Sequence, residues 1–372
     1  MADITKEMVL NALKGVIDPD LNRDIVSLDF VNAERVTIEG STVKATVVLT
    51  TPACPVKEQL QAQCVALIEA LDGVEKADVT MTANTASSRG SGDDARGERL
   101  KSVKNIIAVG SGKGGVGKST VAANMAWALR QTGATVGILD ADIYGPSLPI
   151  LLGLQGQSPL MTAEQKIKPL EKYGMKAISM GFLLKDTDAV VWRGPMLGKA
   201  LQQFIEDVDW GELDYLVIDL PPGTGDVQLS LAQLIPVDGS VIVTTPQDVA
   251  FADVRRAIRM FQMTKVPILG LVENMSYFLC PDNGKKYAIF GEGRTEKHAE
   301  DHKLDFLGRL PLDMKVGPAA DRGELIGIAD PDGEQAAIYK ELAGRVAAEL
   351  SKRHMAKERK GSMAGFFKVV PG

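Results

Sequence analysis

The sequence predicts an α/β protein in which a small α+β domain precedes a doubly wound, mostly parallel sheet. Over residues 101–354, apolar strand-like runs alternate with helical segments, which is typical of a parallel sheet covered by helices. A glycine-rich loop joins the first of these strands to a helix. Residues 1–82 lack this alternation and contain a hairpin signal, so we expect a separate domain there. Residues 83–100 are rich in serine, glycine and charge, which predicts a flexible linker.

The composition indicates a globular protein without a basic excess. The chain has 372 residues, a formal net charge of −6 and 45% hydrophobic residues. The acidic balance argues against a protein that coats nucleic acid, and no run approaches the roughly 20 apolar residues of a transmembrane helix. There is no signal-peptide pattern and no cysteine framework, so we expect a cytoplasmic protein. Residues 355–372 combine a basic run with glycines and a proline, which predicts a disordered tail without stable membrane association.

The elements of the front domain follow from local patterns. Met8, Val9, Ala12 and Leu13 have helical spacing, and a short turn containing Gly40 separates two runs rich in β-branched residues. The predicted elements are a helix over 5–15, strands over 29–38 and 42–50, a helix over 55–71 and a strand over 74–81.

In the second domain the apolar runs give the strands of the parallel sheet. Ligands bind at the carboxyl ends of such strands, so the polar residues at those ends are informative. A closing helix is predicted over 330–351. The predicted strands are 106–110, 135–139, 177–180, 215–220, 240–244, 268–273 and 305–310.

The loop after the first strand, GSGKGGVGKST, fits the phosphate-loop pattern G-x-x-x-x-G-K-[ST] through Gly112, Gly117, Lys118 and Ser119. Glycines let backbone N–H groups turn toward phosphate oxygens, and the following helix adds its positive dipole end. We expect Lys118 to reach the β- and γ-phosphates of ATP and Ser119 to ligate Mg²⁺. An ordinary glycine-rich turn is the alternative. The expected nucleotide contacts are Gly112, Lys113, Gly114, Gly115, Val116, Gly117, Lys118, Ser119 and Thr120.

Carboxylates follow two further strands. Asp219 ends an apolar strand in YLVIDLPPGTGD, which is the Walker B arrangement and predicts a carboxylate that holds Mg²⁺ directly or through water. The glycines and prolines of residues 221–225 are typical of a loop that senses the γ-phosphate. Asp140 and Asp142 follow the strand over 135–139 in ILDADIYGPS. We expect functional roles for Asp140 and Asp219 because three such motifs occur together.

KGGVGKS resembles the deviant phosphate loop of the MinD/ParA/nitrogenase-iron-protein class of ATPases. The resemblance implies a homodimer that sandwiches two ATP molecules, with Lys113 reaching the nucleotide of the partner subunit. It assigns Asp142 to orienting the attacking water, with a water-mediated contact to Mg²⁺ as the alternative. It also implies that Asn274 hydrogen-bonds the adenine and that Pro311 lies in the loop against which the base packs.

The front domain resembles a second family. VIDPDLNRDIVSLDFV and LTTPACPVKEQL are similar to the small metal-sulfur cluster assembly domain related to SufT and PaaD, and Cys54 occupies that family's cysteine position. Cys54 lies where a strand ends and a helix begins, and a helix N-terminus favours the thiolate that binds metal or sulfur. Asp18 and Asp20 belong to a site or shape the turn around Pro19. Cys64 has core spacing on its helix.

Over nearly its whole length the chain resembles Mrp/ApbC-type iron–sulfur cluster carriers, through DADIYGPS, WRGPM, DLPPGTGD and ENMSYF. The resemblance implies an ATPase with slow, Mg²⁺-dependent hydrolysis. It would hold a cluster transiently, expected to be [4Fe–4S], and pass it from scaffold proteins to recipient apoproteins. That family carries C-x-x-C after ENMSYF, whereas this chain has Cys280 and Asn283. A dimer then offers two thiolates, so Cys54 or another ligand completes the site, binding is weaker, or the function is modified.

Two other functions remain open from the sequence. A positioning ATPase like MinD or ParA would share the phosphate loop, and a cluster-free, ATP-dependent scaffold or regulator would fit the missing second cysteine. Arg193, in WRGPM, is structural or belongs to the dimer interface. His298 and His302 have a spacing that can bind a metal, but without a third ligand a solvated helix is the better interpretation.

Overall fold

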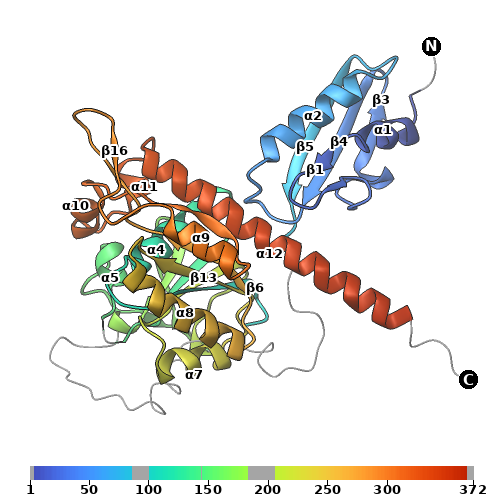
Figure 1. The fold of residues 1–372 in the computed structure, drawn as a ribbon. Helices are drawn as coiled ribbons and strands as arrows, with labels where there is room; N and C mark the ends of the chain where they lie inside the picture. The colour runs from blue at the N-terminus through green and yellow to red at the C-terminus, as the bar shows by residue number, and fades with distance from the viewer. Residues whose placement is uncertain (1–3, 86–99, 144, 183–205, 367–372) are drawn as a thin grey trace, which may run out of the picture. The chain divides into compact units, whose positions relative to one another are not determined.

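The computed structural model describes residues 4–85, 100–143, 145–182 and 206–366. Figure 1 shows the fold of each part. The chain divides into two compact units, one made of Met1–Ala86 with Ala347–Gly372 and one of Ser87–Val346.

The first unit is a three-stranded sheet with two helices. Its strand order is β3-β4-β5, with β3 and β4 antiparallel and β4 and β5 parallel. Residues on one face of β4, among them Val43 and Val47, are fully buried, as period-2 alternation requires. The elements are α1 Lys6–Leu13, β1 Ile17–Asp18, β2 Arg23–Asp24, η1 Ala33–Arg35, β3 Val36–Glu39, β4 Thr42–Leu49, α2 Lys57–Glu69 and β5 Lys76–Ala83.

The strand predicted over 29–38 is wrong in its first part. Only β3, Val36–Glu39, is a strand, and a loop and a short 3-10 helix precede it. Asp29 has a left-handed backbone with φ of 56°, and the Asn32 side chain accepts a hydrogen bond from the Glu34 amide. Aspartate and asparagine favour such turn features. These local preferences prevail over the strand preference of the apolar residues nearby. Cys64 is fully buried in the core of this unit, as predicted.

The second unit contains an eight-stranded sheet of order β10-β11-β7-β12-β6-β13-β14-β17. Every neighbouring pair is parallel except the edge pair β10 and β11, so the predicted doubly wound, mostly parallel fold is confirmed. The strands are β6 Val103–Ser111, β7 Val136–Asp140, β10 Leu170–Lys172, β11 Met175–Ser179, β12 Leu213–Asp219, β13 Gly239–Thr244, β14 Ile268–Glu273 and β17 Phe306–Arg309.

Helices cover this sheet, and its central strands β6 and β12 are buried on both faces. The helices are α4 Lys118–Gln131, α5 Leu148–Leu151, α7 Asp226–Leu234, α8 Asp248–Met263, α9 Arg294–Asp301, α10 Val316–Asp321, α11 Ile326–Ala329 and α12 Glu334–Phe366, of which residues 347–366 belong to the first unit. The short remaining elements are β8 Leu160–Met161, β9 Ile167–Lys168, η2 Met180–Phe182, β15 Phe278–Leu279 and β16 Lys286–Tyr287.

The closing helix is longer than predicted. α12 runs to Phe366, through residues expected to form a disordered tail, whereas residues 367–372 lie outside the described part. Buried positions continue at helical spacing through Leu350 and His354, and the residues that follow include strong helix formers such as alanine, lysine and glutamate. Gly361, Gly365 and the basic run, which suggested an end, are therefore tolerated inside the helix.

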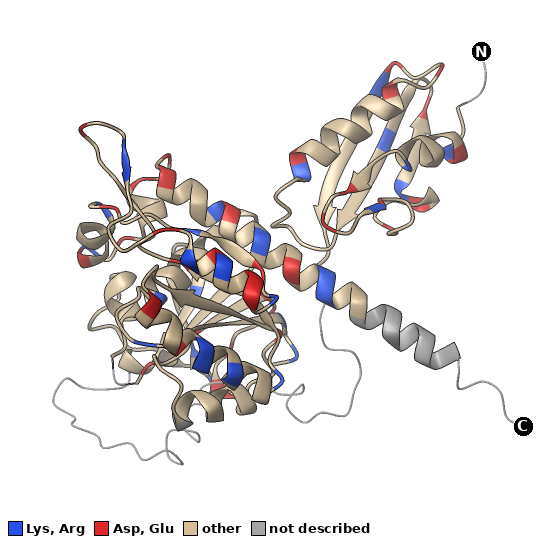
Figure 2. Cartoon of the chain, viewed as in Figure 1, with Lys and Arg blue, Asp and Glu red and all other residues tan. Residues whose placement is uncertain are grey.

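Charges of both signs are mixed over the described residues. Acidic and basic positions alternate along α12 up to Arg353, as Figure 2 shows. Such alternation gives no single-sign stripe along this part of the helix, unlike the basic surfaces that attract nucleic acid or anionic lipid. Among the residues described, no helix is both long and apolar enough to cross a bilayer.

Candidate functional site

Three neighbouring strands place the predicted motifs at one edge of the sheet. In the register of the parallel ladders, Asp219 of β12 lies opposite Val109 of β6 on one side and Asp140 of β7 on the other. The loops after these strands surround a cavity of about 220 Å³. Its lining residues are Ser111, Lys113, Gly114, Gly115, Gly117, Lys118, Ser119, Thr120, Asp142 and Pro222.

The glycines of the loop are required by its backbone. Gly115 and Gly117 have φ of 77° and 78°, and Gly117 is the N-cap of α4. A β-carbon on Gly117 would lie 2.3 Å from Nδ2 of Asn274. A β-carbon on Gly112 would lie 2.3 Å from the backbone carbon of Asp253 in α8. The loop is therefore packed closely against both α8 and the residue that follows β14.

We expect Gly112→Ala to lower the free energy of unfolding by about 1–3 kcal/mol, because the new methyl group would overlap main-chain atoms. It should also weaken nucleotide binding by displacing the loop. Gly114→Ala, in the same loop, is the matched control: neither Gly112 nor Gly114 has a left-handed backbone, and the atom nearest to the carbon added at Gly114, Cβ of Pro222, is 3.9 Å away. Denaturant unfolding of both variants checks this, and equal losses in the two would contradict the packing argument.

A buried ion pair lies at the bottom of the cavity. Nζ of Lys118 is 2.5 Å from Oδ1 of Asp219, and it also donates to Oγ of Ser119 at 3.1 Å. The Lys118 and Asp219 side chains are 6% and 1% exposed. Burial raises the pKa of Asp219, and the Lys118 ammonium opposes that shift. The second carboxylate oxygen, Oδ2 of Asp219, is buried and accepts no hydrogen bond from the described residues.

Asp140 and Asp142 have different surroundings. The Asp140 carboxylate is fully buried and accepts hydrogen bonds from the amides of Asp142 and Leu148 and from Oγ of Ser179. Burial and the nearby Asp219 raise the pKa of Asp140 to about 7. The oxygens of Asp140 thus hold the loop after β7, and a functional role for Asp140 stays a prediction. Asp142 lines the cavity, where its Oδ1 accepts a hydrogen bond from the Gly145 amide.

Asn274 touches the phosphate-loop region from the other side. Its Nδ2 donates to the Val116 carbonyl at 2.8 Å, which leaves the amide oxygen for another partner. Pro311 does not line the cavity, and its carbonyl accepts a hydrogen bond from Nε2 of Gln335. The half-buried Lys113 makes no ion pair within the described residues, and its side chain lines the cavity.

Cys280 lies at the end of a β-hairpin. β15 and β16 pair antiparallel, and the Cys280 amide and carbonyl bond to residues 285 and 284. Asn283, which stands where a second cysteine was expected, donates from Nδ2 to Oη of Tyr287 and accepts from the Lys285 amide. Asn283 therefore stabilises the turn. Within the described residues of one chain, no group of three or more histidine, cysteine or acidic side chains could hold a metal ion.

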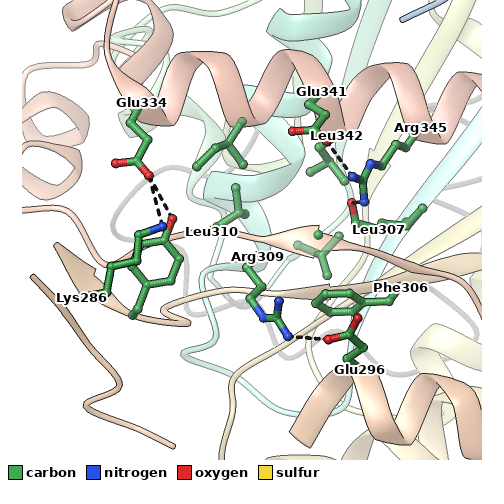
Figure 3. A pocket seen from close by; sticks show the side chains of 14 residues that line it. Lys286, Glu296, Phe306, Leu307, Arg309, Leu310, Glu334, Glu341, Leu342 and Arg345 are labelled. Atoms are coloured by element: carbon green, nitrogen blue, oxygen red, sulfur yellow. Dashed lines mark hydrogen bonds and ion pairs between the residues drawn. The ribbon is translucent and has the colours of Figure 1, made fainter. Parts of the chain in front are cut away.

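A larger cavity of about 450 Å³ lies beside this hairpin, between β17 and α12. Figure 3 shows that its charged side chains pair with one another: Arg309 with Glu296, Arg345 with Glu341, and Lys286 with Glu334. Because these charges are paired and no glycine-rich helix start borders the cavity, we do not assign it to a phosphate ligand.

Cys54 does not have the activated thiol that its place in the sequence predicted. Burial raises the pKa of the Cys54 thiol to about 11; the hydrogen bond from the Val56 amide opposes this shift, and the charges of Asp18 and Asp20 add to it. α2 begins only at Lys57, so the helix dipole acts less directly than expected. The adjoining cavity is about 20 Å³, and Ala348 and Ser351 of the same unit help to line it. Asp18 accepts two backbone hydrogen bonds in the turn around Pro19.

We therefore expect slow alkylation of Cys54 by iodoacetamide at neutral pH. A thiol of pKa about 11 has about 100-fold less thiolate at pH 8 than one of pKa 9, and the thiolate is the nucleophile. The alkylation rate should rise about tenfold per pH unit until the pH approaches 11. Mass spectrometry of the Cys54 peptide measures this rate. The chain unfolded in urea is the control, and equal folded and unfolded rates at pH 8 would contradict the assignment.

The two histidines of α9 have a structural role. The His298 ring stacks on Phe251 with centroids 3.5 Å apart, and the His302 ring lies 5.7 Å from the same phenylalanine. Burial lowers the pKa of His298, against the attraction of Asp248. Both rings thus pack against Phe251 of α8. The prediction that the two histidines lie on a solvated helix is therefore only partly correct. Arg193 lies outside the described residues.

Two family models match the chain. Residues 102–347 match the ParA model, described as NUBPL iron-transfer P-loop NTPase, and residues 6–80 match an iron–sulfur cluster assembly protein model. The chain belongs to the iron-transfer P-loop NTPase family. The fold, the phosphate loop and the two resemblances stated from the sequence agree with this membership.

Relatives with known names match over most of the chain. An iron–sulfur cluster carrier protein of Synechocystis is 46% identical over 352 residues, which are 92% of this chain and 98% of that protein. The protein of the same name from Deinococcus radiodurans is 47% identical over 348 residues, 93% and 96% of the two chains. Among solved structures, a nucleotide-binding protein from Archaeoglobus fulgidus in complex with ADP is 40% identical, with a TM-score of 0.58, and covers 66% of this chain and 96% of its own.

Proposed function

We propose that this protein is an ATP-hydrolysing carrier that holds an iron–sulfur cluster transiently and transfers it to apoproteins. The observation that carries the proposal is the match of both segments, in this order, to relatives named as cluster carriers. We propose the domain boundaries 1–82, 83–100 and 101–354 as part of the same function, whereas residues 355–366 continue α12 and are not a separate disordered tail.

The residues of the phosphate loop fit a nucleotide with Mg²⁺. The orphaned, buried Oδ2 of Asp219 is an oxygen ligand without a donor among the described residues, and Ser119 lies beside the same ion pair. Because Mg²⁺ prefers oxygen ligands, Asp219 and Ser119 would hold it, and it would supply positive charge that offsets the charge of the phosphates. Residues 112–120 would cradle the phosphates, with Lys118 turning from Asp219 toward them.

Other residues would complete the catalytic arrangement. Lys113 would contact the nucleotide of the second subunit of a homodimer, which its unpaired side chain at the cavity allows. Asp142 would orient the attacking water. Asn274 would accept a hydrogen bond from the adenine amino group through its free oxygen, with Pro311 beside the base. Hydrolysis would be slow and would reset the dimer after transfer.

The cargo would be held at Cys280. Two hairpins across a homodimer would bring two thiolates to a cluster of [4Fe–4S] type, with further ligands from a scaffold or recipient protein. Cys54 is a weaker candidate ligand because its cavity of about 20 Å³ has room for roughly one water molecule and its thiol is protonated at neutral pH.

Anaerobic reconstitution with iron and sulfide tests the cargo assignment. We expect a charge-transfer absorption band and bound iron in the parent and in Cys54→Ala, and loss of both in Cys280→Ala. Cys64→Ala, in the core, is the control for cysteine loss as such. Loss of the cluster only in Cys54→Ala would move the site to the first unit.

Asn283 favours a second candidate function, a cluster-free, ATP-dependent regulator. The Asn283 side chain has two hydrogen bonds in the turn, so a stable hairpin does not need metal. A parent protein that hydrolyses ATP but takes up no cluster under anaerobic conditions would favour this function over the carrier.

A further inference from the structure

A buried glutamine outside the recognised motifs contacts the loop after β12. Gln228 is in the first turn of α7 and is 1% exposed. Its Nε2 donates a hydrogen bond to the Pro221 carbonyl. It also lines a cavity of about 370 Å³ together with Asp142, Pro222 and other loop residues. Asp142 and Pro222 line the phosphate-loop cavity as well, so the two cavities share a wall.

The loop over residues 221–225 is held at two points. On one side the Gly223 amide donates to the Ser111 carbonyl at 3.1 Å, directly before the phosphate loop. Gly223 has a φ of 93°, which favours glycine, so this contact depends on a specific backbone conformation. On the other side Gln228 holds Pro221. Pro222, between the two, is the residue that faces the phosphate-loop cavity.

The chemistry of Gln228 indicates what it is needed for. Its Oε1 is buried and accepts no hydrogen bond from the described residues. The reverse orientation of the amide would point Oε1 at the Pro221 carbonyl oxygen, so the donor must face Pro221. A buried amide with an unsatisfied acceptor is not selected for packing, because an apolar side chain would fill the space without that cost. Its useful feature is therefore the hydrogen bond that it donates.

We propose that Gln228 is a positioning residue for ATP hydrolysis: it holds Pro221, and through Pro221 it fixes Pro222 and Gly223 against the phosphate loop beside Asp142. The inference rests on the proposed ATPase function. Gln228 does not line the phosphate-loop cavity, so it acts on the turnover number kcat through loop geometry and not on nucleotide affinity.

The decisive variant is Gln228→Glu, which keeps the size but donates only when its carboxyl is protonated. Burial raises the pKa of such a carboxyl, so the donor is present at acidic pH and lost as pH rises. We expect kcat relative to the parent to be near one at the acidic end and to fall about tenfold or more at pH 8, with KM within about twofold. Gln233→Glu, at an exposed position of α7, is the control and should follow the parent at every pH.

A second measurement does not depend on hydrolysis. In Gln228→Leu, the Gly223 amide should lose hydrogen-exchange protection at least about tenfold, whereas Gln233→Leu should leave it unchanged. A pH-independent kcat ratio in Gln228→Glu overturns the inference. So does unchanged Gly223 protection in Gln228→Leu, even if the parent proves inactive. An inactive parent with the expected loss of protection counts against the proposed ATPase function and leaves the anchoring of the loop supported.

Discussion

Lys118→Ala is expected to reduce ATP hydrolysis by at least about 100-fold, because the buried ammonium proposed to contact the phosphates is lost. The same change leaves Asp219 buried without its partner. Breaking a buried pair in this way costs about 3–5 kcal/mol of unfolding free energy. We therefore expect a lower melting temperature together with the loss of activity, measured by phosphate release and thermal unfolding.

The double variant Lys118→Ala/Asp219→Asn separates these two effects. Removing the buried carboxylate charge should restore much of the stability, since no uncompensated charge remains, but hydrolysis should stay absent. Lys297→Ala, at an exposed position of α9, is the control for loss of a lysine. Hydrolysis at the parental rate in Lys118→Ala would show that this cavity is not the catalytic site.

Asp142→Asn is expected to lower kcat about 100-fold while nucleotide affinity stays within about threefold. The amide keeps the volume and an oxygen for the Gly145 amide, but it loses the charge that we propose to orient the attacking water. Nucleotide affinity should persist because the cradle formed by residues 112–120 is unchanged. Single-turnover hydrolysis and equilibrium binding of ATP measure the two quantities separately.

Asp140→Asn is the matched comparison. Because the Asp140 carboxylate accepts three hydrogen bonds, the amide loses acceptor capacity and should cost on the order of 2 kcal/mol of unfolding free energy. Its main effect should be on stability. If instead Asp140→Asn abolished the chemical step in a fully stable protein, and Asp142→Asn did not, the roles assigned to the two aspartates would be reversed.

Features with local causes could be predicted from the sequence. The phosphate loop follows from glycine and lysine spacing over eight residues, and the parallel sheet follows from apolar runs separated by helical segments. The strand predicted over 29–38 begins too early, because the turn preferences of Asp29 and Asn32 compete with the strand preference of the apolar residues around them. The predicted closing helix ends too early, because glycines and a basic run indicate a helix end, although α12 contains both.

Features with long-range causes could not be predicted. The structural role of Asp140 depends on donors from Leu148 and Ser179, which only the packed fold brings to it. The high pKa of the Cys54 thiol depends on burial that no local pattern reveals. Gln228 was missed, although one signal was available: it is a polar residue that follows the glycine–proline loop by a few positions and precedes an apolar helix face.

Cluster transfer from the reconstituted protein to an apoprotein, with and without Mg·ATP, tests the central claim most directly. In the parent and in Lys297→Ala, we expect Mg·ATP to change the rate of cluster transfer. In Lys118→Ala loaded with the same amount of cluster, we expect the same rate with and without Mg·ATP. Equal transfer rates with and without ATP in the parent would contradict a carrier driven by its nucleotide site.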